Sequence, residues 1–114
     1  MYAEWLAQAG FRVIQAHNGL QALERLVEED VPDVVVIDLN IPGIDGFELT
    51  RRLRQHPTTA HVPVLAVTGY APFAATPERA LRAGCDAMLL KPYSPENFEV
   101  AIRSLIDHRQ PTRA

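Results

Sequence analysis

The sequence has a single cysteine, and it has no long hydrophobic run. One cysteine, Cys85, excludes an internal disulfide and indicates a small packing residue in a reducing compartment, so we expect a cytoplasmic protein. No apolar stretch approaches the roughly 20 residues of a membrane-spanning helix, and the first residues lack the layout of a signal peptide. We therefore expect no association with a membrane.

Basic residues are also sparse. The 11 basic and 14 acidic side chains give a formal net charge of −3, with no long basic cluster. Because binding along nucleic-acid phosphates needs such a cluster, direct binding of nucleic acid is not expected. The 114 residues, 47% of them hydrophobic, suffice for one core. We predict one domain at residues 1–107 and a polar C-terminal tail at 108–114.

Strand-like and helix-like segments alternate along the chain, which is typical of a parallel α/β sheet. Continuous apolar runs rich in β-branched residues predict buried strands, and an alternating run predicts an edge strand at residues 11–16. The buried strands are expected at 34–37, 62–68 and 87–91. Periodic apolar positions, caps and stops predict the helices at 1–9, 18–30, 45–56, 76–83 and 94–107.

Two features of the predicted helices bear on the fold. Asn18 and Ser94 each precede a helix and are expected to cap its first turn. The arginine-rich segment RRLRQ, residues 51–55, is interpreted as an outer surface that faces solvent.

Three polar residues end the three buried strands: Asp38, Thr68 and Lys91. Ligands of open α/β sheets bind beyond the carboxyl ends of the strands, although every strand must leave the core somewhere and coincidence stays an alternative. Lys91 is the only lysine, and its compact charge suits a phosphoryl oxygen that arrives and leaves. Asp38 is a candidate nucleophile of the aspartyl-phosphate type.

At these residues the sequence resembles the receiver domain of two-component response regulators. The matching segments are IDLNIPGIDGFE around Asp38, VTGYA after the next strand, and AGCDAMLLKPY ending at Pro92 and Tyr93. The resemblance covers residues 1–107. It implies a flavodoxin-like, CheY-like fold, which is a doubly wound parallel sheet of order 2-1-3-4-5 with helices on both faces.

The resemblance also implies residue roles. Asp38 would accept a phosphoryl group from a histidine kinase or a phosphotransfer protein. Thr68 would turn inward to bond that group, and Lys91 would pair with it. Asp38 and the backbone carbonyl of Asn40 would bind Mg²⁺.

Further roles follow from the same resemblance. Gly43 and Gly46 would shape the loop after the phosphoacceptor, and Gly69 would leave room for the phosphoryl donor. The peptide bond before Pro92 would be cis. Met88 stands where many receivers have an aromatic residue or a histidine that reports phosphorylation, and a flexible methionine can repack in that place.

The chain departs from the family at its beginning. Receivers start with a central strand that ends in two acids, whereas this chain opens at MYAEWL, within the family's first helix. Without those acids Mg²⁺ would bind weakly. Three explanations stay open. The protein would carry about fifteen further residues before this start, enough for one strand and a loop. Alternatively, the chain assembles with a partner through its open sheet, or it is a degenerate receiver that binds but is not phosphorylated. The helix that is cut part way favours the first.

We therefore expect a phosphorelay signalling domain, not an enzyme, that acts on a separate downstream protein. A phosphorylation-independent interaction module is the alternative. Self-association would use the open sheet or the face formed by residues 87–107. A haloacid-dehalogenase phosphatase would have an acid where Asn40 stands, and a nucleotide-binding module would have a glycine-rich loop after its first strand.

Overall fold

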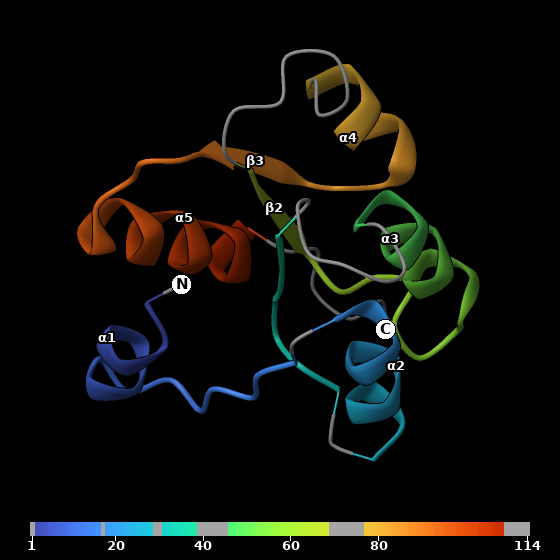
Figure 1. Ribbon diagram of the computed structural model, residues 1–114, viewed down its shortest axis with the longest axis horizontal. Coiled ribbons are helices and arrows are strands. Elements are labelled where there is room, and N and C mark those ends of the chain that lie inside the picture. The colour runs from blue at the N-terminus through green and yellow to red at the C-terminus, as the bar shows by residue number, and fades with distance from the viewer. Residues whose placement is uncertain (1, 17, 29–30, 39–45, 69–76, 109–114) are drawn as a thin grey trace.

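The computed structural model describes the backbone of residues 2–16, 18–28, 31–38, 46–68 and 77–108. From residue 35 onward these residues form strands and helices in the alternating order that the sequence predicts, whereas the first two helices follow one another with no strand between them (Figure 1). The elements are α1 (Ala3–Gln8), α2 (Gly19–Glu28), β1 (Val35–Asp38), α3 (Gly46–Gln55), β2 (Val64–Thr68), α4 (Pro77–Ala83), β3 (Ala87–Leu90) and α5 (Pro95–His108).

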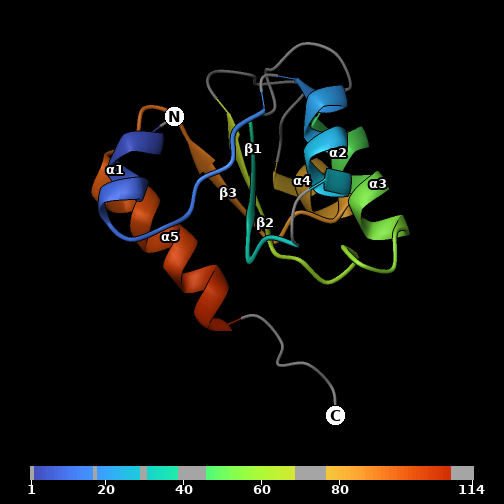
Figure 2. The same ribbon diagram turned by 90° about the horizontal axis from the view of Figure 1, so that it is seen from below.

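The three strands form one parallel sheet in the order β1-β2-β3. Val35 lies opposite Val64, and Leu65 lies opposite Ala87. Figure 2 shows α1 and α5 on one face of the sheet and α2, α3 and α4 on the other face. The predicted α/β architecture with helices on both faces is confirmed, with three strands among the described residues.

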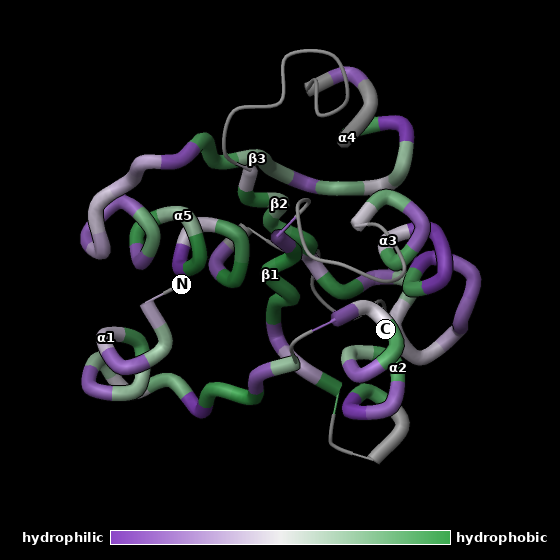
Figure 3. Tube along the Cα trace, in the orientation of Figure 1, coloured by the Kyte–Doolittle hydropathy of each residue, from purple (hydrophilic) through white to green (hydrophobic). Residues whose placement is uncertain are grey.

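The core consists of two layers separated by the sheet. Every residue of β2 is buried, as expected of a strand with helices over both faces. On the α3 side, Ile37 packs with Phe47 and Leu53, and on the α5 side Leu65 packs with Phe98. Figure 3 shows hydrophobic residues along β1 and β2, at the centre of the molecule.

Local capping fixes two helix starts as the sequence predicts. The Asn18 Oδ1 accepts a hydrogen bond from the Gln21 amide at 2.8 Å, before α2. The Ser94 Oγ accepts one from the Asn97 amide at 3.0 Å, before α5. Such caps satisfy amides that have no partner within the helix.

Helix α1 is held against α5 by polar and aromatic contacts. The Tyr2 hydroxyl donates to the Tyr93 carbonyl at 2.8 Å, and the Trp5 Nε1 donates to the Glu99 Oε1 at 2.8 Å. The Tyr2 ring also meets the Tyr93 ring edge to face, with centroids 5.7 Å apart. These contacts set the path of the chain toward residue 11.

Residues 11–16 form no strand, so the prediction of an edge strand there is wrong. A strand exists through its hydrogen bonds to a neighbour. The segment runs beside the sheet (Figure 2), but a groove separates it from β1. The alternating pattern correctly indicated that one side faces the core: Val13 packs on the α5 layer, whereas Ile14 is 40% exposed.

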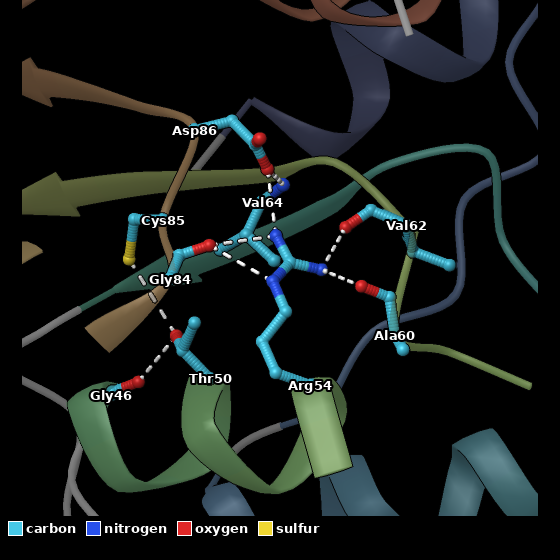
Figure 4. A network of polar contacts seen from close by, with 9 residues as sticks. All are labelled: Gly46, Thr50, Arg54, Ala60, Val62, Val64, Gly84, Cys85 and Asp86. Atoms are coloured by element: carbon cyan, nitrogen blue, oxygen red, sulfur yellow. Dashed lines mark hydrogen bonds and ion pairs between the residues drawn. The ribbon is translucent and has the colours of Figure 1, made fainter. Parts of the chain in front are cut away.

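Arg54 is only partly exposed, so the interpretation of the whole segment 51–55 as solvent-facing is wrong at this residue. Its guanidinium donates to the Gly84 carbonyl at 2.7 and 3.0 Å and to the Val62 carbonyl at 2.6 Å (Figure 4). It also pairs with Asp86, at 2.8 Å from Oδ2. The end of α3 is thereby tied to the amino ends of β2 and β3.

Among the helices that the structure describes, none combines the length and the apolar character needed to cross a bilayer.

Candidate functional site

An ion pair lies at the carboxyl ends of the strands. Asp38 is the last residue of β1, and Lys91 follows the last residue of β3. The Lys91 Nζ lies 2.6 Å from the Asp38 Oδ2, so the lysine side chain reaches across the end of β2, the strand between them. The Lys91 and Asp38 side chains are 39% and 28% exposed. A pair this accessible stabilises the fold by roughly 1 kcal/mol or less.

Thr68 ends β2 between these two residues. Its carbonyl accepts a hydrogen bond from the Lys91 amide at 2.7 Å, which fixes the backbone beside the lysine. Its side chain is 1% exposed, and its Oγ1 has no hydrogen-bond partner among the described residues. A buried hydroxyl without a partner costs about 1–3 kcal/mol, so such a group needs an explanation.

The sheet register brings the three predicted residues together. Asp38 lies opposite Val67, and Thr68 lies opposite Leu90, so the three strands end at nearly the same level. The result is a carboxylate, an ammonium and a hydroxyl at one edge. A carboxylate can attack an electrophile, and a cation and a hydroxyl donor can stabilise an anionic group attached to it.

Tyr93 is a site neighbour that the sequence reasoning missed as a functional candidate. Burial raises the pKa of its phenol above the ordinary value of 10.0, and the nearby Lys91 charge acts in the opposite direction. The phenol is therefore neutral and contributes no charge to the site at neutral pH. Its position two residues after Lys91 was the available signal.

The structure describes some of the remaining predicted site residues and not others. Met88 lies on β3 opposite Ala66 and packs against the α3 layer of the core. The peptide bond between Lys91 and Pro92 is cis, as the resemblance implied. Gly46 does not belong to a loop: it is the buried first residue of α3, and its carbonyl accepts the Thr50 hydroxyl at 2.8 Å. Three predicted residues lie outside the described part of the chain: Asn40, Gly43 and Gly69.

The described residues do not by themselves fit a magnesium ion. Mg²⁺ requires near-octahedral oxygen coordination and usually takes one or two carboxylates with further oxygen ligands. Within the described ranges, no three acidic, histidine or cysteine side chains gather in a way that could hold a metal. Asp38 offers one carboxylate, and Lys91 already contacts it.

The chain is similar to known signalling proteins over most of its length. Residues 1–103 match the response regulator receiver domain. The chain is 33% identical over 106 residues to the polar-differentiation response regulator DivK of Brucella anthropi, a match that covers 93% of this chain and 85% of DivK.

Two solved structures extend the comparison. The receiver domain of the sensor histidine kinase PA1611 from Pseudomonas aeruginosa, with magnesium coordinated in its active site cleft, is 28% identical with a TM-score of 0.78, and the match covers 91% of this chain and 84% of that one. A CheY-like receiver domain protein from Methanospirillum hungatei is 25% identical with a TM-score of 0.79, with coverage of 93% and 82%.

Proposed function

The chain belongs to the response regulator receiver domain family of two-component signalling, and from this premise we propose that Asp38 is its phosphoacceptor. The observation that carries the proposal is the Thr68 hydroxyl, which is buried and has no partner among the described residues beside the Asp38–Lys91 ion pair. A phosphoryl oxygen is an acceptor that would satisfy this hydroxyl. In this proposal the Thr68 hydroxyl has no partner while Asp38 is unphosphorylated and gains one when Asp38 is phosphorylated.

The proposed reaction is a phosphoryl transfer. A carboxylate oxygen of Asp38 forms a bond to the phosphorus of a donor phosphohistidine while the phosphorus–nitrogen bond breaks. The electron pair leaves with the imidazole, which takes up a proton from water. Asp38 becomes an acyl phosphate, whose added negative charge and acceptor oxygens are the signal.

Lys91 and Thr68 respond to that charge. The Lys91 Nζ, now at 2.6 Å from Asp38, transfers its contact to a phosphoryl oxygen, and the Thr68 hydroxyl donates to another. These contacts favour one of two arrangements of the site. Met88, diagonal to Thr68 across the β2–β3 pair, is the side chain that we expect to repack.

The partners follow from the chemistry and from the family. The donor is a histidine kinase or a phosphotransfer protein, and the receiver of the signal is a separate target protein. We place this exchange in the cytoplasm. Residues 1–107 form the receiver domain, and residues 108–114 form its tail.

The second candidate function is a phosphorylation-independent interaction module. One observation favours it: the described residues supply a single carboxylate at the site, a poor donor set for Mg²⁺. In that case the fold would present a binding surface, and Asp38 would remain unmodified.

The intact mass of the chain, after incubation with acetyl phosphate and Mg²⁺, separates the two candidates. We expect the parent to gain one phosphoryl group and Asp38→Asn to gain none. Asp33→Asn is the matched control, because Asp33 lies just before the opposite end of the same strand, and it should gain the group as the parent does. Full labelling of Asp38→Asn refutes the assignment of the site. An unlabelled parent agrees with the interaction module and also with acidic Mg²⁺ ligands in residues that precede this sequence, and labelling of a chain extended at its amino end separates these two.

A further inference from the structure

The place of the Lys91 ammonium depends on how the backbone around it is held. The side chain reaches across the end of β2 to Asp38 and is 39% exposed. A lysine stem is flexible, so neighbouring side chains alone do not fix its charged end. On the amino side, the Lys91 amide donates to the Thr68 carbonyl at 2.7 Å. On the carboxyl side, residues 91–94 are in no helix or strand, so this segment needs contacts from elsewhere in the fold.

Tyr2, the residue before α1, supplies such a contact. Its hydroxyl donates to the Tyr93 carbonyl at 2.8 Å. Pro92, between Lys91 and Tyr93, has no amide hydrogen and cannot donate a hydrogen bond of its own. Within the described ranges, the bond from Tyr2 is the one hydrogen bond found to the backbone of residues 92 and 93. The backbone after Lys91 is therefore tied to α1, which Figure 2 shows beside the first turns of α5.

Three aromatic rings reinforce this hydrogen bond. The Tyr2 and Tyr93 ring centroids are 5.7 Å apart, and those of Tyr93 and Phe98 are 5.2 Å apart. The Tyr2 and Phe98 centroids are 6.1 Å apart, so all three pairs lie within the range of about 4.5–7 Å at which aromatic rings attract one another. Phe98 is 0% exposed and packs in the core, so it anchors the other two rings. Tyr93 is thereby held at both its ring and its carbonyl.

We propose that Tyr2 is a positioning residue for Lys91, because its hydroxyl holds the Tyr93 carbonyl and so keeps the Lys91 ammonium beside Asp38, ready to contact a phosphoryl group. As a role in phosphoryl transfer, this inference rests on the proposed function. Tyr2 acts through Tyr93 and is not itself a catalytic residue. Helix α1, which carries none of the reacting groups, becomes in this way a support of the site.

Lys91 is the only lysine in the chain, so its amine can be followed by itself. Brief methylation with formaldehyde and cyanoborohydride modifies amines, and the Lys91 ammonium must leave Asp38 and lose a proton before it reacts. Cleavage after arginine releases residues 83–103, which separates Lys91 from the terminal amino group. The methylated fraction of this peptide, followed over time by mass spectrometry, gives a rate constant for Lys91 without any phosphodonor.

Two variants of α1 and its cap separate positioning from simple stabilisation. Tyr2→Phe keeps the ring and removes only the hydroxyl. Trp5→Phe is the matched control, because it removes another aromatic donor that reaches from α1 to α5, the Trp5 Nε1 at 2.8 Å from the Glu99 Oε1. If Tyr2 only stabilised α1, the two variants would behave alike.

We expect the Lys91 rate constant to rise in Tyr2→Phe and to keep the parent's value in Trp5→Phe. Asp38→Asn sets the upper limit, a rise of about fivefold, which corresponds to an ion pair of about 1 kcal/mol. The rise in Tyr2→Phe should be about two- to threefold, because the ion pair is loosened and not removed. Circular dichroism of each variant verifies that it is folded.

Three outcomes overturn the proposal. One is an equal rate constant in Tyr2→Phe and the parent, and another is an equal rise in Tyr2→Phe and Trp5→Phe. The third is a rate constant in Asp38→Asn that does not exceed the parent's, because the ion pair would then not restrain Lys91 in solution.

Labelling with acetyl phosphate and Mg²⁺ tests the role in phosphoryl transfer. Tyr2→Phe should gain the phosphoryl group about two- to threefold more slowly than the parent, and Trp5→Phe at the parent's rate. Equal initial rates in Tyr2→Phe and the parent overturn that role. A parent that gains no phosphoryl group bears on the proposed function alone, because methylation still decides what positions Lys91. The failures of the two proposals are therefore distinguishable.

Discussion

Replacing Thr68 with valine should make the protein more stable. Valine has nearly the same shape as threonine but carries a methyl group where the hydroxyl stands. The Thr68 side chain is 1% exposed, and its hydroxyl has no partner among the described residues. The substitution removes a desolvated polar group without opening a cavity, so nothing favourable is lost in the resting protein.

The size of this stabilisation follows from the burial of the Thr68 hydroxyl without a hydrogen-bond partner among the described residues. A buried polar group without a partner costs about 1–3 kcal/mol, and a methyl group in its place gains burial instead. We expect the free energy of unfolding to rise by about 1 kcal/mol. For a domain of this size that corresponds to an increase in Tm of about 4 °C.

Thr59 provides the matched control. Its side chain is 6% exposed, and its hydroxyl donates to the Leu53 carbonyl at 2.7 Å. The same substitution there removes a hydrogen bond that exists, so Thr59→Val should lower the free energy of unfolding by about 1 kcal/mol. Urea unfolding followed by circular dichroism measures both variants under one condition.

The two variants should therefore change stability in opposite directions. If Thr68→Val is destabilised as much as Thr59→Val, the Thr68 hydroxyl is satisfied in the resting protein. The reasoning that reserves it for a phosphoryl oxygen would then be refuted.

Three further predictions concern other parts of the fold. Gly10 and Gly84 have positive φ values, +103° and +108°, at which alanine is strained. A Cβ would meet nothing within 4 Å at Gly10, but at Gly84 it would lie 2.9 Å from the Arg54 Cγ. Replacement by alanine should therefore lower the free energy of unfolding, measured with urea, by about 1–3 kcal/mol at Gly10 and by more at Gly84. Arg54→Lys should lower the free energy of unfolding by about 2 kcal/mol, because lysine cannot serve the same carbonyls together; an unchanged urea midpoint would contradict this. The pKa of Glu99 is lowered from 4.5, chiefly by a hydrogen bond from Arg103 and next by one from Trp5. These contacts are therefore present above pH 4.5 and are lost as the pH falls through the lowered pKa. Trp5 is the only tryptophan, so its fluorescence should change as Glu99 is protonated in the parent, and should not change in Glu99→Gln.

Much of the fold could be predicted because its signals are local. The caps at Asn18 and Ser94 are read from single residues and their neighbours, and both are present. The buried strands could be read from continuous β-branched runs, and β2 is buried along its whole length. Since parallel strands leave the sheet at one edge, the meeting of Asp38 with Lys91 followed from their places at strand ends.

The errors arose where the outcome depends on distant partners. Residues 11–16 have the pattern of a strand, but pairing needs a neighbour that the described chain does not supply. Arg54 stands beside two exposed arginines and differs from them through carbonyls that the fold brings to it, from Val62 at 2.6 Å, eight positions away, and from Gly84 at 3.0 Å, thirty positions away. The missing partner of the Thr68 hydroxyl likewise has no sequence signal, because it is a property of three-dimensional packing.

The position of Arg54 has a mechanical consequence. Its guanidinium joins α3 to the amino ends of β2 and β3, whereas Asp38 and Lys91 lie at the opposite end of the sheet. The amino ends of β2 and β3 are thus tied by a guanidinium that lies far from Asp38, whereas the carboxyl ends of β1 and β3 are joined through the Asp38–Lys91 pair itself. A charge change at Asp38 would therefore alter the contact at one end of the sheet and leave the contact at the other end in place.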